Sequence, residues 1–118
     1  MPEGVKQLIS ASFYKRNGKH AGFHIKGHSG YSEAGSDIVC SAVSAIAQTT
    51  LLGLIEIVKP EMDYKIDQEG EIDCIIHKET NEGALMRAEL LIDTMRLGLE
   101  SIKQNYGKYL SISEREVT

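Results

Sequence analysis

The chain has 118 residues, of which 42% are hydrophobic and 25% charged, and its net charge is −4. This balance is that of a globular protein rather than a disordered one, and the length fits a single domain, residues 1–118, with one hydrophobic core. The negative charge argues against direct binding of nucleic acid through its phosphates.

The sequence also favours a cytoplasmic location. Residues 1–6 lack the basic-then-apolar pattern of a secretion signal. The apolar stretch 38–58 is about long enough to cross a bilayer. However, it contains polar residues such as Gln48 and Glu56, so we expect a buried helix and no membrane partner. Two cysteines without a signal indicate a reducing compartment and free thiols.

The N-terminal part of the chain is predicted to form a β-hairpin. Residues 8–15 have the composition of a strand, and Asn17-Gly18 is the strongest short hairpin signal because both residues tolerate positive φ. Residues 20–26 then return as the second strand. Its inward face is expected to carry Ala21, Phe23 and Ile25.

A long apolar helix is predicted over residues 37–58. Ser36 or Asp37 can cap it by accepting from the free N–H groups of its first turn, and Pro60 ends it. Hydrophobic residues occupy 14 of the 21 positions in 38–58. A helix that is apolar nearly all round has to be covered on more than one side, so we expect a second subunit to cover the face that the sheet leaves free.

A second hairpin is predicted from residues 63–68 and 71–78, with the turn at Glu69-Gly70. The second of these strands alternates apolar and polar positions. Its inward residues are expected to be Ile72, Cys74 and Ile76.

The last third of the chain is predicted to hold a second helix and a closing strand. Asn81 is the expected cap of a helix over 82–105, and Gly107 suits its exit. The helix has an apolar stripe formed by Leu85, Ala88, Ile92, Met95, Leu99 and Ile102. Residues 109–113 alternate as a strand, and 114–118 are expected to be a frayed tail.

The predicted order is therefore ββαββαβ. Short hairpins imply a mostly antiparallel sheet, and the two helices are expected to pack on one face of it. The predicted fold class is an α+β two-layer sandwich.

The stretch from Gly27 to Cys40 contains the main candidates for catalytic residues. A glycine-containing loop leaves His28 and runs into the predicted helix, which places Cys40 in the first turn. Free N–H groups and the helix dipole favour a thiolate at that position. The loop can fold back and bring His28 to Cys40. The two residues would then form a Cys–His pair, which supplies the nucleophile and the base that thiol nucleophilic catalysis requires.

Other interpretations of the cysteines stay open. Free cysteines are among the most buried residue types, so a non-catalytic dimeric binding module with a structural Cys40 is the main alternative. A thiol-dependent hydrolase acting on a different substrate is another. The chain has no Cys-x-x-Cys motif, and Cys74 is expected in the core, so a dithiol redox role is disfavoured.

The spacing of three histidines suggests a metal site, but the distance between them along a strand excludes it. His20, His24 and His28 recur every four residues. On a strand this spacing covers about 13 Å, too far for one metal with bonds near 2 Å. We therefore expect no metal and no cofactor.

The residues around the cysteine and histidine each have two interpretations. Asp37 either caps the helix or orients His28. Ser44, one turn after Cys40, either hydrogen-bonds the thiolate or back-bonds to the Cys40 carbonyl. Three glycines are either ordinary loop residues or positions that admit a substrate backbone and let the loop move: Gly27, Gly30 and Gly35.

These residues together resemble a known family. Residues 27–31 (Gly-His-Ser-Gly-Tyr), 37–44 (Asp-Ile-Val-Cys-Ser-Ala-Val-Ser) and 48–49 (Gln-Thr) are similar to the ribosomal-processing cysteine protease family, Prp. The resemblance extends over most of the chain, from the hairpin at Asn17 to the C-terminal strand. Ser29 is a departure, since the family usually has alanine there.

The resemblance implies a cytoplasmic bacterial endopeptidase that acts as a homodimer. Its substrate would be a ribosomal protein precursor, cut at the N-terminal extension of this large-subunit protein. Cys40 would be the nucleophile and His28 the base. The supporting motif positions would be Gly27, Asp37 and Ser44. We expect the loop 29–36 to be mobile without substrate and to order over an extended peptide, with Ser29, Gly30, Tyr31, Gly35 and Ser36 as its substrate-facing residues.

Overall fold

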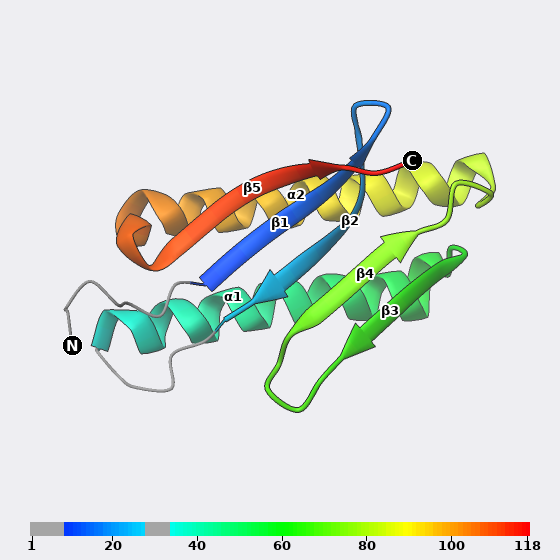
Figure 1. Cartoon of the computed structure of the whole chain (residues 1–118). Helices are drawn as coiled ribbons and strands as arrows, with labels where there is room; N and C mark the ends of the chain where they lie inside the picture. Colours follow the sequence, from blue (N-terminus) through cyan, green and yellow to red (C-terminus); the bar gives the residue numbers. More distant parts are fainter. Residues whose placement is uncertain (1–8, 28–33) are drawn as a thin grey trace.

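The computed structural model describes residues 9–27 and 34–118, with residues 34–37 described by their backbone alone. Within these ranges the elements follow the predicted order (Figure 1). They are β1 (Ile9–Arg16), β2 (Lys19–Lys26), α1 (Ala34–Gly53), a π-helical turn η1 (Leu54–Val58), β3 (Met62–Ile66), β4 (Ile72–Ile76), α2 (Glu82–Tyr106), a 3₁₀ turn η2 (Gly107–Tyr109) and β5 (Leu110–Glu116).

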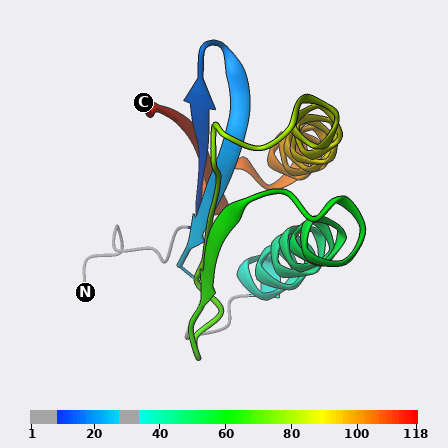
Figure 2. The same cartoon turned by 90° about the vertical axis from the view of Figure 1, so that its right-hand side faces the viewer.

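The five strands form one sheet in the order β3-β4-β2-β1-β5. Neighbouring strands are antiparallel except β1 and β5, which are parallel. Both helices lie side by side on one face of this sheet, and among the described residues no helix covers the other face (Figure 2). The predicted α+β two-layer sandwich is therefore confirmed.

The hydrophobic core lies between the sheet and the two helices. The residues predicted to point inward from β2 and β4 are buried, as is the centre of the predicted stripe on α2. The largest fully buried side chains are Phe13, Phe23, Leu51, Leu54, Ile72, Ile76, Ile92, Met95, Leu99 and Leu110.

Local signals located the turns and one cap correctly. Asn17 and Gly18 have φ of 54° and 79°, the positive pair that a tight hairpin turn requires. The Asn81 side chain accepts a 2.9 Å hydrogen bond from the Ala84 N–H at the start of α2. Gly107 follows the last residue of α2 as predicted, but its φ is −59°, so the chain continues into η2 instead of turning left-handed.

The predicted start of the first helix was wrong. α1 begins at Ala34, three residues earlier, so Ser36 and Asp37 lie inside its first turn and neither is its N-cap. The reason is that alanine is the best helix former and that first-turn N–H groups need no partner within the helix. Gly35 and Ser36 are therefore tolerated there.

The predicted end of that helix at residue 58 was right, with a change of hydrogen bonding on the way. The α-helix ends at Gly53, and η1 carries the chain on to Val58. Lys59 then adopts a left-handed φ of 56°, and its N–H donates a 2.8 Å hydrogen bond to the Leu54 carbonyl.

The prediction of a frayed C-terminal tail was also wrong. β5 runs to Glu116 beside β1, and the Val117 N–H donates to the Lys15 carbonyl at 2.9 Å. Arg96 of α2 donates to Glu114 at 2.5 Å. These partners are distant in sequence, so local composition did not reveal them.

Within the described residues, the outer side of α1 exposes apolar side chains such as Ile38 and Leu52 among polar ones such as Gln48 and Thr49. By length and composition alone, Ile38–Val58 is long and apolar enough to cross a membrane, a property that core helices of soluble proteins share. Its inner side forms part of the core through Val43, Leu51 and Leu54, while Leu52 and Ile57 are exposed.

Candidate active site

Cys40 lies on the flank of α1 that faces away from α2. On the opposite flank, Ile46 lies against Gly98 and Gly53 against Leu91, both in α2. Cys40 precedes Ile46 by six residues, which places it about 120° away around the helix axis. Ser44 follows one turn after Cys40 on the same flank. Both side chains are half-buried, and the Cys40 thiol is free.

The earlier start of α1 changes the environment predicted for this thiol. Cys40 is the seventh residue of the helix and lies in its second turn, so its predicted first-turn position was wrong. The effect of the helix dipole falls off within the first turn, and in an α-helix the N–H of a seventh residue bonds the carbonyl four residues earlier. Cys40 therefore lies beyond the free first-turn N–H groups among which the sequence had placed it.

The segment that precedes α1 leaves the sheet at the same end of the molecule. Gly27 follows β2 directly with a φ of 94°, a left-handed conformation that favours glycine. The end of β2 and the start of α1 lie near each other in Figure 1. The chain therefore passes from β2 to α1 at this end of the fold, with Gly27 on the sheet side and Cys40 in the second turn of the helix.

Several predicted site residues lie outside the described part of the chain. His28, Ser29, Gly30 and Tyr31 are not among the described residues. The backbones of Gly35, Ser36 and Asp37 belong to the first turn of α1, and their side chains are not described. The contact between His28 and Cys40 stays a prediction, and so does the role of Asp37.

The second cysteine has the environment predicted for a core residue. Cys74 is buried in β4, and its thiol donates to the Met62 sulfur at 3.9 Å. Burial, with a smaller contribution from the charge of Asp73, raises the pKa of the Cys74 thiol to about 12. Cys74 is therefore protonated at neutral pH, which leaves Cys40 as the candidate nucleophile of the two.

The described histidines each pair with a carboxylate from another element. His20 contacts Asp93 of α2 at 2.5 Å, His24 contacts Glu71 at 2.6 Å, and His77 contacts Asp63 at 3.0 Å. No local pattern predicted these pairs, because most partners are far apart in the chain. In the described ranges, no three His, Cys, Asp or Glu side chains form a group that could hold a metal ion.

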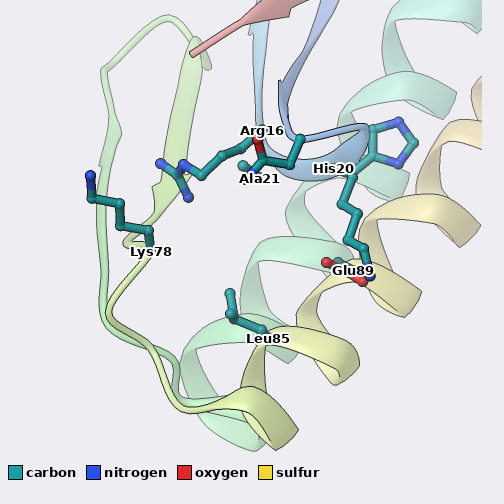
Figure 3. Close-up of a pocket in the computed structure, with 8 residues that line it drawn as sticks. Arg16, His20, Ala21, Lys78, Leu85 and Glu89 are labelled. Atoms are coloured by element: carbon teal, nitrogen blue, oxygen red, sulfur yellow. The ribbon is translucent and has the colours of Figure 1, made fainter. Parts of the chain in front are cut away.

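A hollow of about 230 Å³ lies at the opposite end of β2, beside the β1–β2 turn (Figure 3). It contains none of the predicted site residues. Its lining comes from the hairpin, from the loop before α2 and from the first turns of α2: Arg16, Asn17, Lys19, His20, Ala21, Lys78, Leu85 and Glu89. Because β2 separates it from Gly27, this hollow is not part of the Cys40 site.

A free, partly buried thiol in the second turn of α1, with a second thiol buried in the core, makes Cys40 the candidate nucleophile of a thiol enzyme. Comparison with known proteins makes the class specific. Residues 8–111 match the family model described as cysteine protease Prp. The chain therefore belongs to the Prp family and is a cysteine protease.

Curated relatives agree with this assignment. The ribosomal processing cysteine protease Prp of Staphylococcus aureus (strain Mu50) is 27% identical over 96 residues, covering 81% of this chain and 88% of the relative. The protein of the same name from Bacillus subtilis (strain 168) is 28% identical over 92 residues, covering 77% and 82%.

Solved structures show the same fold. The S. aureus ribosomal processing protease Prp, in complex with a covalently linked product peptide, has a TM-score of 0.76 and 23% identity, covering 92% of this chain and all of that one. The same protease with a substrate peptide also has a TM-score of 0.76, at 22% identity.

Proposed function

We propose that this chain is a cytoplasmic bacterial endopeptidase that removes the N-terminal extension of a large-subunit ribosomal protein. The observation that carries the proposal is the contrast between its two thiols, because Cys40 is only partly buried at the edge of the core and Cys74 is fully buried within it. Relatives named as ribosomal processing proteases, aligned over about four-fifths of the chain, support the substrate class.

In the proposed reaction, His28 takes the proton of Cys40, and the thiolate attacks the scissile carbonyl. The C–N bond then breaks as His28 gives the proton to the leaving amine. Water hydrolyses the resulting thioester and regenerates the free thiol. Backbone N–H groups would hold the oxyanion, an effect worth about 3 kcal/mol per donor in comparable sites.

The supporting positions have separate roles in this proposal. Gly27 has the left-handed backbone that starts the loop toward His28. Ser44, one turn after Cys40, is placed to hydrogen-bond the thiolate. Asp37 orients His28. Because α1 begins at Ala34, the predicted loop 29–36 is shortened to residues 29–33. Ser29, Gly30 and Tyr31 of this loop close over the bound peptide, and Gly35 and Ser36 contribute from the first turn of α1.

We also propose that the protease is a homodimer that associates through the outer faces of its helices. Leu90 and Leu97 of α2 are 66% and 69% exposed. They adjoin an apolar hollow of about 450 Å³ between α1 and α2, lined by Ala45, Ile46, Thr49, Thr50, Leu91, Thr94, Met95 and Gly98. A contiguous apolar surface of this kind is typical of a protein–protein interface.

The test of the activity is cleavage of a peptide that spans the N-terminal extension of the host's own ribosomal protein. The parent, Cys40→Ala and Cys74→Ala are compared, with products identified by mass spectrometry. One cut by the parent and by Cys74→Ala, with none by Cys40→Ala, supports the proposal. No cut by any of them, with equal peptide binding by parent and Cys40→Ala, favours a binding module instead.

A further inference from the structure

The outer edge of β3 is unpaired in the described part of the chain, because β3 ends the sheet on that side. The His77 N–H donates to the Glu61 carbonyl at 2.7 Å, and the Asp67 N–H donates to the Glu71 carbonyl at 3.1 Å. In an antiparallel pair, bonded positions alternate with unbonded ones. The odd-numbered residues of β3 therefore bond β4, and the N–H and C=O groups of Met62, Tyr64 and Ile66 point outward.

The charged residues of β3, Asp63 and Lys65, lie on the sheet face opposite Tyr64 and Ile66, so the side of this edge that faces the helices carries no charge from β3. β3 pairs with β4 without a register shift, and no proline interrupts it. Tyr64 and Ile66 are 50% and 49% exposed. The other edge strand, β5, ends in the charged residues 114–116, which discourage pairing. The two edges differ, and β3 is the one suited to accept another strand.

The free edge lies on the same side of the molecule as Cys40. Tyr64 and Ile66 are opposite Cys74 and Ile72, whose buried side chains face the helices. A strand added beside β3 would therefore place alternate side chains next to Tyr64 and Ile66, on the side where α1 presents Cys40. Figure 2 shows α1 at the level of the green strands β3 and β4 and α2 at the level of the blue strands, so the flank of α1 that faces away from α2 is on the β3 side.

The direction and length of β3 also suit a peptide that continues toward the end of the sheet where β2 leads into Gly27. β3 runs parallel to β2, and Ile66 is aligned through Ile72 with Ile25, two residues before Gly27. A strand added to β3 would lie three strand spacings from β2, about 14 Å. An extended chain covers that distance in about four or five residues, so the docked residues would lie several positions from the scissile bond.

The charge of the residues around β3 indicates which kind of peptide would bind to this edge. Residues 56–73 contain seven carboxylates and two lysines, a net charge of −5, whereas the rest of the chain has a net charge of +1. The negative charge of the protein is thus concentrated around β3 and the β3–β4 turn. It attracts a cationic peptide and repels a second copy of the same edge.

We propose that β3 is the docking strand for a cationic, extended segment of the substrate, which pairs with the outward backbone groups of Tyr64 and Ile66 and continues to Cys40. This is β-strand addition, in which main-chain hydrogen bonds give affinity and alternate side chains give specificity. The inference rests on the proposed endopeptidase function and names how that substrate is held.

The experiment compares Tyr64→Pro with Tyr64→Ala, each in the Cys40→Ala background, for binding of the extension peptide. Both variants lose the side chain, but only proline removes the outward N–H, and it leaves the bonds to β4 in place. We expect Tyr64→Pro to bind about tenfold more weakly than Tyr64→Ala. Equal affinity of the two variants would overturn the docking site and leave cleavage by the parent unaffected.

A second measurement changes the peptide and leaves the protein intact, so it does not depend on the folding of a variant. Backbone N-methylation at each position in turn should weaken binding at alternate positions within the docked segment, because every second N–H of an added strand faces β3. Added salt and Glu69→Gln should both weaken binding. Loss at consecutive positions, or none outside the scissile region, would contradict strand addition.

The outcomes separate this inference from the proposed activity. If the parent does not cut but Tyr64→Pro selectively loses binding, the docking edge stands and the endopeptidase activity falls. If Tyr64→Pro instead converts a dimer to a monomer without changing peptide affinity, the edge is a contact between protomers and the docking site is overturned.

Discussion

The hydroxyl of Tyr14 donates a 2.6 Å hydrogen bond to the Asp73 carboxylate across an intervening strand. Tyr14 belongs to β1 and Asp73 to β4, and β2 lies between them. Tyr14 is in register with Gly22 of β2, which has no side chain to obstruct the path. Burial first, and then the hydrogen bond to Asp73, raises the pKa of Tyr14 to about 12.

This pair predicts a loss of stability at alkaline pH. The folded protein holds Tyr14 protonated more strongly than the unfolded chain, whose tyrosine has a pKa near 10. The contribution is therefore complete below about pH 10 and is lost as pH rises toward 12. We expect urea unfolding to show a steeper decline over pH 10–12 for the parent than for Tyr14→Phe. Identical pH profiles would contradict the assignment.

Gly22 is predicted to be intolerant of any side chain. A Cβ atom built there would lie 2.1 Å from the Cys74 carbonyl oxygen, which belongs to the backbone and cannot move aside. We expect Gly22→Ala to lower the free energy of unfolding by at least about 2 kcal/mol. Gly107→Ala is the matched control, since a Cβ there meets nothing within 4 Å and its φ is −59°. Equal effects of the two changes would refute this explanation.

The two thiols are predicted to react very differently in the folded protein. Iodoacetamide should label Cys40 and leave Cys74 unmodified at pH 8, because burial raises the pKa of Cys74 to about 12. Mass spectrometry of the folded protein should show one adduct, and of the urea-unfolded protein two. Labelling of Cys74 at a comparable rate in the folded state would show that β4 opens readily. A Cys40 rate no faster than a model thiol would favour the binding-module alternative.

The proposed dimer predicts a specific effect of charge on the outer face of α2. Leu90→Asp places a carboxylate in the exposed apolar surface and should convert the dimer to a monomer, because an unpaired charge is costly to bury in an interface. Lys19→Asp is the control, since Lys19 is exposed in the β1–β2 hairpin. Light scattering reports the mass of each. A parent that is already monomeric at micromolar concentration would reject the dimer.

Most elements of the fold could be predicted from local patterns. Asn17-Gly18 located the first turn, and Asn81 located the start of α2, because each signal depends only on nearby backbone geometry. Local patterns did not predict structure that depends on contacts between residues distant in the sequence. The extent of β5 depends on pairing with β1 and on Arg96 bonding Glu114, and no local signal reports such contacts.

In the candidate site, too, some features were predicted from local patterns and others depended on the fold. Alternation of apolar residues around Cys74 correctly predicted burial, and the motif that runs from Gly27 to Ser44 correctly predicted the family. The turn of α1 that holds Cys40 was predicted wrongly, because helix starts depend on competing caps and propensities that differ by little. The flank that Cys40 occupies followed only from the contacts between α1 and α2.

Local sequence patterns were sufficient to predict the order of elements and the inward faces, to single out Cys40 as the candidate nucleophile, and to reveal the concentration of acidic residues in 56–73. Hydrophobic periodicity and residue chemistry depend on residues close together in the chain, so they can be recognised in the sequence directly. The strand order, which makes β3 an edge, and the register, which turns the backbone groups of Tyr64 and Ile66 outward, became evident from the folded chain alone. Pairing between strands distant in the sequence is a cooperative result of packing the whole core, so no single segment encodes it.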